Sequence, residues 1–316
     1  MGGTEATVLR VTLMLSRQVR VVHFQNGRTE TETTGAGLLR PLAEAFAPMA
    51  GTTFVVINAW KVACKLRKAH PLARVLLWLH IHPGRHNRPM GAALRQAGIG
   101  VICVSRSHAD GLRAFLGTGP LPEIRHIHNP VADDLTPDET PRDPDRLLFA
   151  SAPHKGLREV FAQFRAVRAA IPGLTLAVAD PGYLAWDTGP VPDGVTVLGP
   201  LPHPALIAQM RRALCLFYPQ TSFAETFGLV LAEANAVGTP VLVHRGLGAN
   251  DEVAGDPAQR VNGHDTAALI ARLDLWRSDP PTVAADPRFR LTAVVTQWAD
   301  ALHLDAVARV SSRKVA

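Results

Sequence analysis

The stretch Tyr218–Val243, YPQTSFAETFGLVLAEANAVGTPVLV, is the most informative part of the 316-residue chain. An apolar strand ends at Tyr218, a polar loop follows, and a helix carrying Glu233 begins near Leu229. The N–H groups and dipole at the start of such a helix form a receptor for an anion such as a pyrophosphate. Glu225, just before the helix, and Glu233, two turns into it, then offer one carboxylate to a sugar and the other to ribose hydroxyls.

The composition predicts a soluble protein of two domains, since about 150 residues per domain is usual. It is 47% hydrophobic and 19% charged with 25 Gly and 25 Pro, which excludes a disordered chain, a collagen-like fibre and a coiled coil. Three scattered cysteines exclude a disulfide framework and a Cys-ligated zinc site, and they favour a cytoplasmic location. We find no signal pattern and no apolar run long enough to span a bilayer.

The net charge of +6 is unevenly distributed. Residues 1–135 carry +8 and residues 136–316 carry −2, so the first half favours an anionic partner, although a solvated basic face without a partner is an equal alternative. Lys61, Lys65, Arg67 and Lys68 lie on or near one predicted helix. This cluster is compatible with peripheral contact to an anionic membrane, at its inner face, and equally with a plain solvated helix. A nucleic-acid partner is not expected, because no aromatic platform accompanies the basic residues.

Strand and helix patterns alternate along both halves, which predicts α/β domains with parallel sheets. In the first half we expect helices at 6–16, 38–46, 60–68 and 107–116 and strands at 19–24, 53–58, 74–80, 98–104 and 124–128. In the second we expect strands at 146–150, 175–179, 195–199, 215–218 and 240–243, with helices at 157–170, 204–212 and 229–236. The last helix is expected over Leu291–Val310.

These patterns predict two doubly wound, Rossmann-like domains that face a cleft, where ligands bind beyond the carboxyl ends of the strands. The predicted divisions are a first domain at 1–135, a linker at 136–146, a second domain at 147–290 and a terminal helix at 291–316. A Rossmann-like half normally opens with a strand, but here Gly2-Gly3-Thr4-Glu5 is followed at once by a helix. We therefore expect the first domain to be truncated at its start.

The segment around Glu225 and Glu233 resembles the E-x7-E signature of retaining glycosyltransferases of family 4, which have the GT-B fold. Three further stretches resemble that family in the same order. They are the lysine-glycine loop Ser151–Leu157, the strand end Val197-Leu198-Gly199-Pro200, and the Gly-rich loop at Gly2 and Gly3. The resemblance is firm over about residues 146–255 and looser before them.

The resemblance implies that 1–135 is the acceptor-side domain, that 147–290 is the nucleotide-sugar domain, and that the helix at 291–316 crosses back to the first domain. It also implies roles for individual residues. Lys155 would neutralise the donor diphosphate, Glu225 would hold sugar hydroxyls, and Glu233 would bind the ribose. The donor site would also include Ser151, Leu198 and Gly199, with the N–H groups of Phe227, Gly228 and Leu229 facing the phosphates. Gly2, Gly3 and Asn58 would lie on the acceptor side. The family usually carries an arginine five residues before its lysine, where this chain has Ala150, and His154 or Ser151 would substitute in part.

The stretch 76–82, LLWLHIH, ends a predicted strand with His80 and His82 on one face. The resemblance implies that His80 contacts the donor sugar, with His82 as the alternative. A His-x-His pair at a strand end also occurs in metal-dependent hydrolase barrels, but further ligands at later strand ends are missing here. Asn129, in a loop, is equally compatible with binding and with capping.

No metal site is predicted. Asp143-Pro144-Asp145 matches the Asp-x-Asp of metal-dependent transferases, but it lies in a Pro-rich linker rather than between a strand and a helix. Gly246-Leu247-Gly248 lacks the context of a dinucleotide fingerprint and is expected to form a loop facing the donor sugar, beside residues 250–252.

Together these observations predict a metal-independent, retaining glycosyltransferase that needs no cofactor beyond its nucleotide-diphosphate sugar. A glycan or a lipid-linked molecule would be the acceptor. A non-catalytic protein that binds nucleotide sugar or a partner is the main alternative, because the opening strand and the phosphate-binding arginine are missing.

Overall fold

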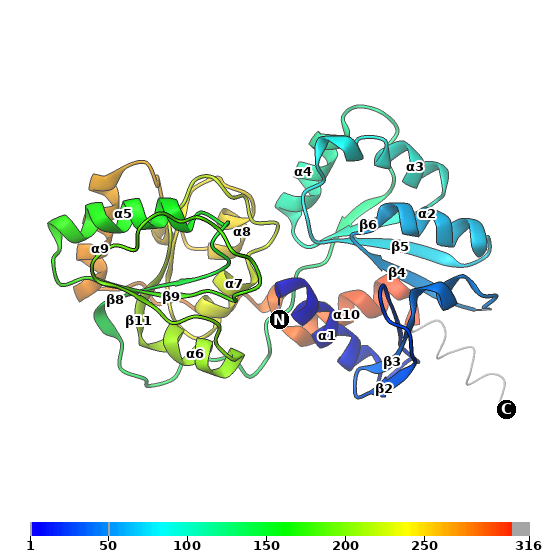
Figure 1. The fold of residues 1–316 in the computed structure, drawn as a ribbon, viewed down its shortest axis with the longest axis horizontal. Coiled ribbons are helices and arrows are strands. Elements are labelled where there is room, and N and C mark those ends of the chain that lie inside the picture. Colours follow the sequence, from blue (N-terminus) through cyan, green and yellow to red (C-terminus); the bar gives the residue numbers. More distant parts are fainter. Residues whose placement is uncertain (1, 50, 305–316) are drawn as a thin grey trace. The chain divides into compact units, whose positions relative to one another are not determined.

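The structure is a computed structural model that describes residues 2–49 and 51–304. Its contacts divide the chain into two units, each described here by itself. The C-terminal unit consists of residues 131–290 and also takes in the start of the chain up to Gly3. The N-terminal unit consists of residues 4–130 together with the chain from Leu291 onward. Figure 1 shows the elements of both.

The C-terminal unit is built on a six-stranded parallel sheet with the order β10-β9-β8-β11-β12-β13. Its strands are β8 (Asp143–Ala150), β9 (Thr175–Ala179), β10 (Val195–Val197), β11 (Ala213–Tyr218), β12 (Val241–His244) and β13 (Arg260–Val261). Its helices are α5 (Leu157–Ala170), α6 (His203–Arg212), α7 (Leu229–Ala236), α8 (Asn250–Ala254) and α9 (Thr266–Ser278), with 3-10 turns η3 (Pro257–Gln259) and η4 (Pro287–Phe289). Every residue of β11 is buried, as expected for a central strand covered on both faces.

The strand order of this sheet determines where a ligand binds. From β8 the chain moves outward through β9 to the edge strand β10, and then returns to β11 on the other side of β8. The two loops that leave β8 and β11 therefore diverge at a topological switch point. In sheets of this kind, the carboxyl ends of the two strands at the switch point border the binding crevice.

The N-terminal unit has a four-stranded parallel sheet with the order β4-β5-β6-β7. Its strands are β4 (Thr53–Ile57), β5 (Arg74–Leu79), β6 (Gly100–Cys103) and β7 (Ile124–His126). The helices are α1 (Gly3–Leu15), α2 (Trp60–Ala69), α3 (Met90–Gln96), α4 (Arg106–Leu116) and α10 (Leu291–Leu302), with 3-10 turns η1 (Leu42–Phe46) and η2 (Arg85–Asn87). In α10, the buried Trp298 packs on Trp78 of β5 with ring centroids 4.4 Å apart.

A separate three-stranded sheet contradicts two predictions in this unit. It consists of β1 (Val22–Gln25), β2 (Glu32–Thr34) and β3 (Gly37–Pro41), so the strand expected at 19–24 does not join the main sheet. The helix expected at 38–46 is instead β3 followed by η1. Pro41 explains this difference, because proline lacks an N–H and clashes with the preceding turn inside an α-helix.

Two further boundaries differ from expectation. The last four residues of the predicted 136–146 linker belong to β8, in which Asp143 lies opposite Ala213 of β11. The final helix ends at Leu302, and residues 305–310 of its predicted range lie outside the described part of the chain. No helix in the described residues is long and apolar enough to cross a membrane.

Candidate functional site

The loops that follow β8 and β11 meet at the switch point of the C-terminal sheet. Lys155 comes from the first loop and Glu225 from the second, and the Lys155 Nζ lies 2.9 Å from Oε1 and 3.1 Å from Oε2 of Glu225. The Glu225 side chain is 7% exposed and that of Lys155 is 24% exposed. The structure thus brings together the two residues that the sequence assigned to the diphosphate and to the sugar.

Tyr218, the last residue of β11, contacts the carboxylate of Glu225. Its hydroxyl donates a hydrogen bond of 3.0 Å to Oε1 of Glu225. Burial, and then the neighbouring Glu225 carboxylate, raise the pKa of Tyr218 well above its ordinary value, so the phenol remains a donor. Ser151 also hydrogen-bonds with Tyr218 and lies beside this group. Sequence reasoning gave Tyr218 no role, although its position at the strand end was a usable signal.

Three aromatic side chains, Phe223, His154 and Trp186, contact one another in turn beside this ion pair. The Lys155 Nζ lies 4.9 Å from the centre of the Phe223 ring, and the His154 ring meets Phe223 at 5.6 Å and Trp186 at 5.9 Å. Burial, and then the charge of Lys155, lower the pKa of His154, so its ring is neutral near pH 7. Trp186, which is 57% exposed, was not identified from the sequence.

The backbone of the loop after β11 is fixed by two side chains. Gln220 accepts hydrogen bonds from the N–H groups of Ser222 and Phe223, and Glu159 of α5 accepts from the N–H and hydroxyl of Thr221. Gly156 has a φ of +89°, and a Cβ there would lie 2.7 Å from Gln220. Only glycine therefore allows the two loops to pack this closely.

The start of α7 lies directly beyond Glu225. Gly228 precedes the helix with a φ of 84°, and no side chain caps the helix start. Phe227 is a core residue that packs on Phe289 at 5.1 Å, and the predicted role needs only its N–H group, as it does at Leu229. Gly248 lies against the backbone of Glu225, where a Cβ would come within 2.5 Å of the Glu225 carbonyl oxygen.

Glu233 is buried within α7 and meets a histidine from a different loop. The His203 Nε2 lies 3.0 Å from Oε1 of Glu233. His203 begins α6, a few residues after Leu198 and Gly199, and the Leu198 N–H bonds to Val178 of β9. The structure therefore links the second carboxylate to the segment after β10, a contact that the sequence did not predict.

Asn58, His80 and His82 follow β4 and β5 and lie at the carboxyl edge of the N-terminal sheet. Asn58 accepts a hydrogen bond of 2.7 Å from the His80 N–H, and the His80 ring packs on Trp78. Burial, and then His108, lower the pKa of His80 to about 3, so this imidazole is neutral. The alternative residue, His82, lies against His108 with ring centroids 5.1 Å apart. Gly3 begins α1 next to Gly2, and both are grouped with the C-terminal unit. Asn129, which follows β7, is buried.

The two carboxylates of the Asp-x-Asp motif, Asp143 and Asp145, each contact a neighbouring group of the protein. Asp145 forms an ion pair of 2.8 Å with Arg277 of α9, and Asp143 accepts a hydrogen bond from the Asp145 N–H. Both carboxylates therefore have partners within the C-terminal unit.

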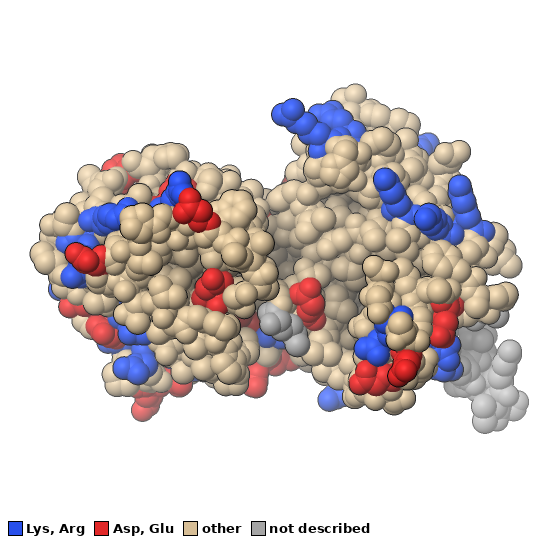
Figure 2. All heavy atoms as spheres, in the orientation of Figure 1, with Lys and Arg blue, Asp and Glu red and all other residues tan. Residues whose placement is uncertain are grey.

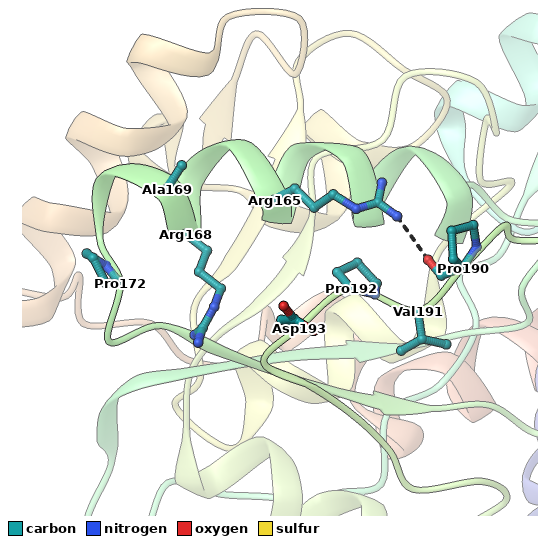
Figure 3. Close-up of a pocket in the computed structure, with 8 residues that line it drawn as sticks. All are labelled: Arg165, Arg168, Ala169, Pro172, Pro190, Val191, Pro192 and Asp193. Atoms are coloured by element: carbon teal, nitrogen blue, oxygen red, sulfur yellow. Dashed lines mark hydrogen bonds between the residues drawn. The ribbon is translucent and has the colours of Figure 1, made fainter.

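A pocket of about 560 Å³ lies elsewhere on the C-terminal unit, between α5 and the loop before β10 (Figure 3). Arg165 and Arg168 both face it, but Arg165 donates to the Pro190 carbonyl at 2.9 Å and Arg168 to the Leu174 carbonyl. Arg165 thus fastens the loop before β10 to α5, and Arg168 fastens the residue before β9 to the same helix. The pocket contains neither Lys155 nor Glu225, so it is separate from the candidate site.

Comparison with known proteins places this arrangement in context. Residues 145–286 match the family described as glycosyl transferases group 1. The matched segment contains Lys155, Glu225 and Glu233 and most of the C-terminal unit.

Curated relatives match over a similar region. A D-inositol 3-phosphate glycosyltransferase from Catenulispora acidiphila is 40% identical over 111 residues, which cover 34% of this chain and 26% of that protein. A D-inositol 3-phosphate glycosyltransferase from Thermomonospora curvata is 36% identical over 124 residues, covering 39% and 27%. The matches thus span about a quarter of the length of these relatives.

Solved structures extend the likeness to both units. A glycosyltransferase from Rickettsia africae aligns with a TM-score of 0.64 at 13% identity, covering 95% of this chain and 94% of that one. The trehalose-6-phosphate synthase OtsA aligns with a TM-score of 0.63 at 13% identity, covering 96% and 91%. The chain has the GT-B fold of two Rossmann-like domains, as its sequence predicted.

Proposed function

We propose that the chain is a glycosyltransferase that moves a sugar from a nucleotide-diphosphate sugar to a glycan or lipid-linked acceptor. The observation that carries this proposal is the Lys155–Glu225 pair at the switch point, within the segment matched to group 1 glycosyl transferases. A lysine and a helix start supply positive charge for a diphosphate, and two buried carboxylates supply acceptors for hydroxyl groups.

The mechanism that we propose is retaining and independent of metal, as in glycosyltransferase family 4. On donor binding, the Lys155 ammonium turns from Glu225 towards the diphosphate and stabilises it as it leaves. Glu225 then accepts hydrogen bonds from the sugar, and Glu233 does so from the ribose.

No carboxylate is assigned as a nucleophile in the transfer step. The acceptor attacks from the side that the diphosphate leaves, and a donor phosphate oxygen takes its proton. His80 is assigned to the sugar and Asn58 to the acceptor side, and the reaction takes place in the cytoplasm.

Thermal unfolding with UDP, GDP and ADP tests the donor site. A nucleotide at 100 times its Kd stabilises the folded state by about 2.7 kcal/mol, a shift of several degrees in Tm. We expect one nucleotide to give this shift and Glu233→Ala to abolish it, with Glu139→Ala, an exposed carboxylate outside the site, as the matched control. If no nucleotide shifts the Tm of the folded protein, the donor assignment is wrong.

A non-catalytic protein that binds nucleotide sugar is the second candidate, and Ala150 favours it by taking the place of a phosphate-binding arginine. Transfer or hydrolysis of the donor separates the two. Activity in the wild type that survives a chelator and is lost in Glu225→Ala, with nucleotide binding retained, would support the transferase. Nucleotide binding without turnover of any donor sugar would support the second candidate.

A further inference from the structure

The stretch between Glu44 and Asp110 has an unusual charge distribution. It contains nine Lys or Arg residues and no Asp or Glu. In the fold this stretch forms β4 to β6 together with α2, η2 and α3. The basic excess of the chain is therefore concentrated on one part of the N-terminal unit.

Three lysines of this stretch form a stripe along α2. Lys61, Lys65 and Lys68 are separated by four and three residues, so they lie on one face of the helix, and all three are exposed. Within residues 2–49 and 51–304, no carboxylate pairs with any of them. Figure 2 shows Lys and Arg side chains gathered over α2, with no Asp or Glu among them on the face in view. The stripe thus presents uncompensated positive charge to solvent.

The turn after α2 carries an exposed apolar side chain four residues beyond Lys68. Leu72 is 100% exposed. Its turn is ordered, because Arg67 donates to the Ala73 carbonyl at 2.5 Å and the buried His70 bonds to the Ala45 carbonyl at 2.8 Å. A leucine that an anchored turn holds entirely in water can gain free energy by burying its side chain against a partner.

We propose that Lys61, Lys65, Lys68 and Leu72 form a docking surface for an anionic lipid bilayer. The lysines meet negatively charged headgroups, and Leu72 enters the boundary between headgroups and acyl chains. The phosphate backbone of a nucleic acid would form ion pairs with the lysines but would not bury the Leu72 side chain in an apolar environment. A bilayer offers both interactions and therefore fits this surface better. Binding here needs no donor sugar, so its outcome is independent of the proposed transfer activity.

Sedimentation of the purified chain with vesicles tests this surface. We expect binding to vesicles of equal parts phosphatidylglycerol and phosphatidylcholine, weakening from 0.05 to 0.5 M salt, and little binding to phosphatidylcholine alone. Each basic side chain near an anionic surface strengthens binding roughly fivefold. The triple variant Lys61→Gln, Lys65→Gln, Lys68→Gln should therefore bind about 100-fold more weakly, and Leu72→Ser about tenfold more weakly with an unchanged dependence on salt.

Matched variants provide the controls. Arg17→Gln, Arg20→Gln and Arg245→Gln together change the net charge equally at exposed positions outside the stripe, and Leu275→Ser replaces another exposed leucine. The proposal fails if the two triple variants weaken binding equally, or if neutral vesicles bind as tightly as anionic ones. It also fails if a short DNA duplex binds more tightly than the vesicles and displaces the protein from them. Far-UV circular dichroism of each variant verifies that it is folded.

Discussion

The ammonium group of Lys155 and the carboxylate of Glu225 lie 2.9 Å apart although 70 positions separate them in the sequence. One residue follows β8 and the other follows β11, so the pairing of these two strands is what joins them. Each charge neutralises the other within a largely buried site. A donor diphosphate would have to replace the carboxylate as the partner of Lys155.

Breaking this ion pair should destabilise the C-terminal unit. Lys155→Met leaves a buried carboxylate with Tyr218 as its remaining side-chain donor, and we expect a loss of about 2 kcal/mol, reduced from the full buried-pair value because Lys155 is partly exposed. Glu225→Gln should cost less, and the double variant should cost less than the sum of the two. Urea unfolding measures all three. The exposed pair Arg158 and Asp187, changed to Met and Asn, should show no measurable coupling. Strict additivity at Lys155 and Glu225 would contradict the pairing.

Gly248 should tolerate no side chain, whereas its neighbour Gly246 should. Both have positive φ, but a Cβ at 248 would lie 2.5 Å from the Glu225 carbonyl oxygen, and a Cβ at 246 meets nothing within 4 Å. Gly246→Ala should cost about 1 kcal/mol for the left-handed backbone, and Gly248→Ala about 2–3 kcal/mol more for the steric overlap. Thermal unfolding compares the two. Equal losses of stability in the two variants would show that the backbone at Glu225 moves to make room for the added methyl group, and would contradict the prediction.

Acid should destabilise the N-terminal unit through His80. Burial holds the pKa of this imidazole at about 3 in the folded state, against 6.5 ordinarily, so below pH 6.5 the unfolded chain binds a proton that the folded chain excludes. Stability is therefore complete above pH 6.5 and is lost as the pH falls towards 3, by about 2 kcal/mol at pH 5. Urea unfolding at pH 7.5 and 5.0 should show this loss in the wild type and a smaller one in His80→Phe. The exposed His86→Asn serves as the control, and an unchanged pH dependence in His80→Phe would disprove the assignment.

Trp298 should be essential for the N-terminal unit. It is 1% exposed and packs on Trp78 from the far end of the chain. Trp298→Ala should cost about 3–5 kcal/mol, the usual range for a buried tryptophan, while the exposed Thr296→Ala on the same helix should cost little. Limited proteolysis should then release an intact C-terminal unit from Trp298→Ala. Equal resistance of the two variants would show that α10 is dispensable.

Much of the fold could be predicted because its strands are continuous apolar runs. The run Leu214–Phe217 and the amphipathic pattern of α5 each permit one interpretation, and both elements form as expected. The prediction of a helix at 38–46 is wrong, because the leucines there have helical spacing although the stretch forms β3 and η1. Gly37 and Pro41 there carried the opposing signal: a Cβ at 37 would lie 2.6 Å from the Val21 carbonyl oxygen.

The residues of the candidate site could be named from the sequence, but their contacts could not. Glu225 and Lys155 were each assigned by family resemblance, which gives a role without giving a neighbour. Their contact, like that of Glu233 with His203, depends on strand order and loop packing. The Trp186 ring next to His154 arises in the same way, from two loops that no local pattern connects.

The place of α10 in the chain has a consequence for how the protein is synthesised. The ribosome makes residues 4–130 first, yet the unit that they form is completed by a helix that emerges only after residue 290. All six strands of the C-terminal sheet are translated before that helix. The unit made earlier is therefore expected to finish folding later, and until then the Trp78 indole lacks the Trp298 ring that packs on it in the folded unit.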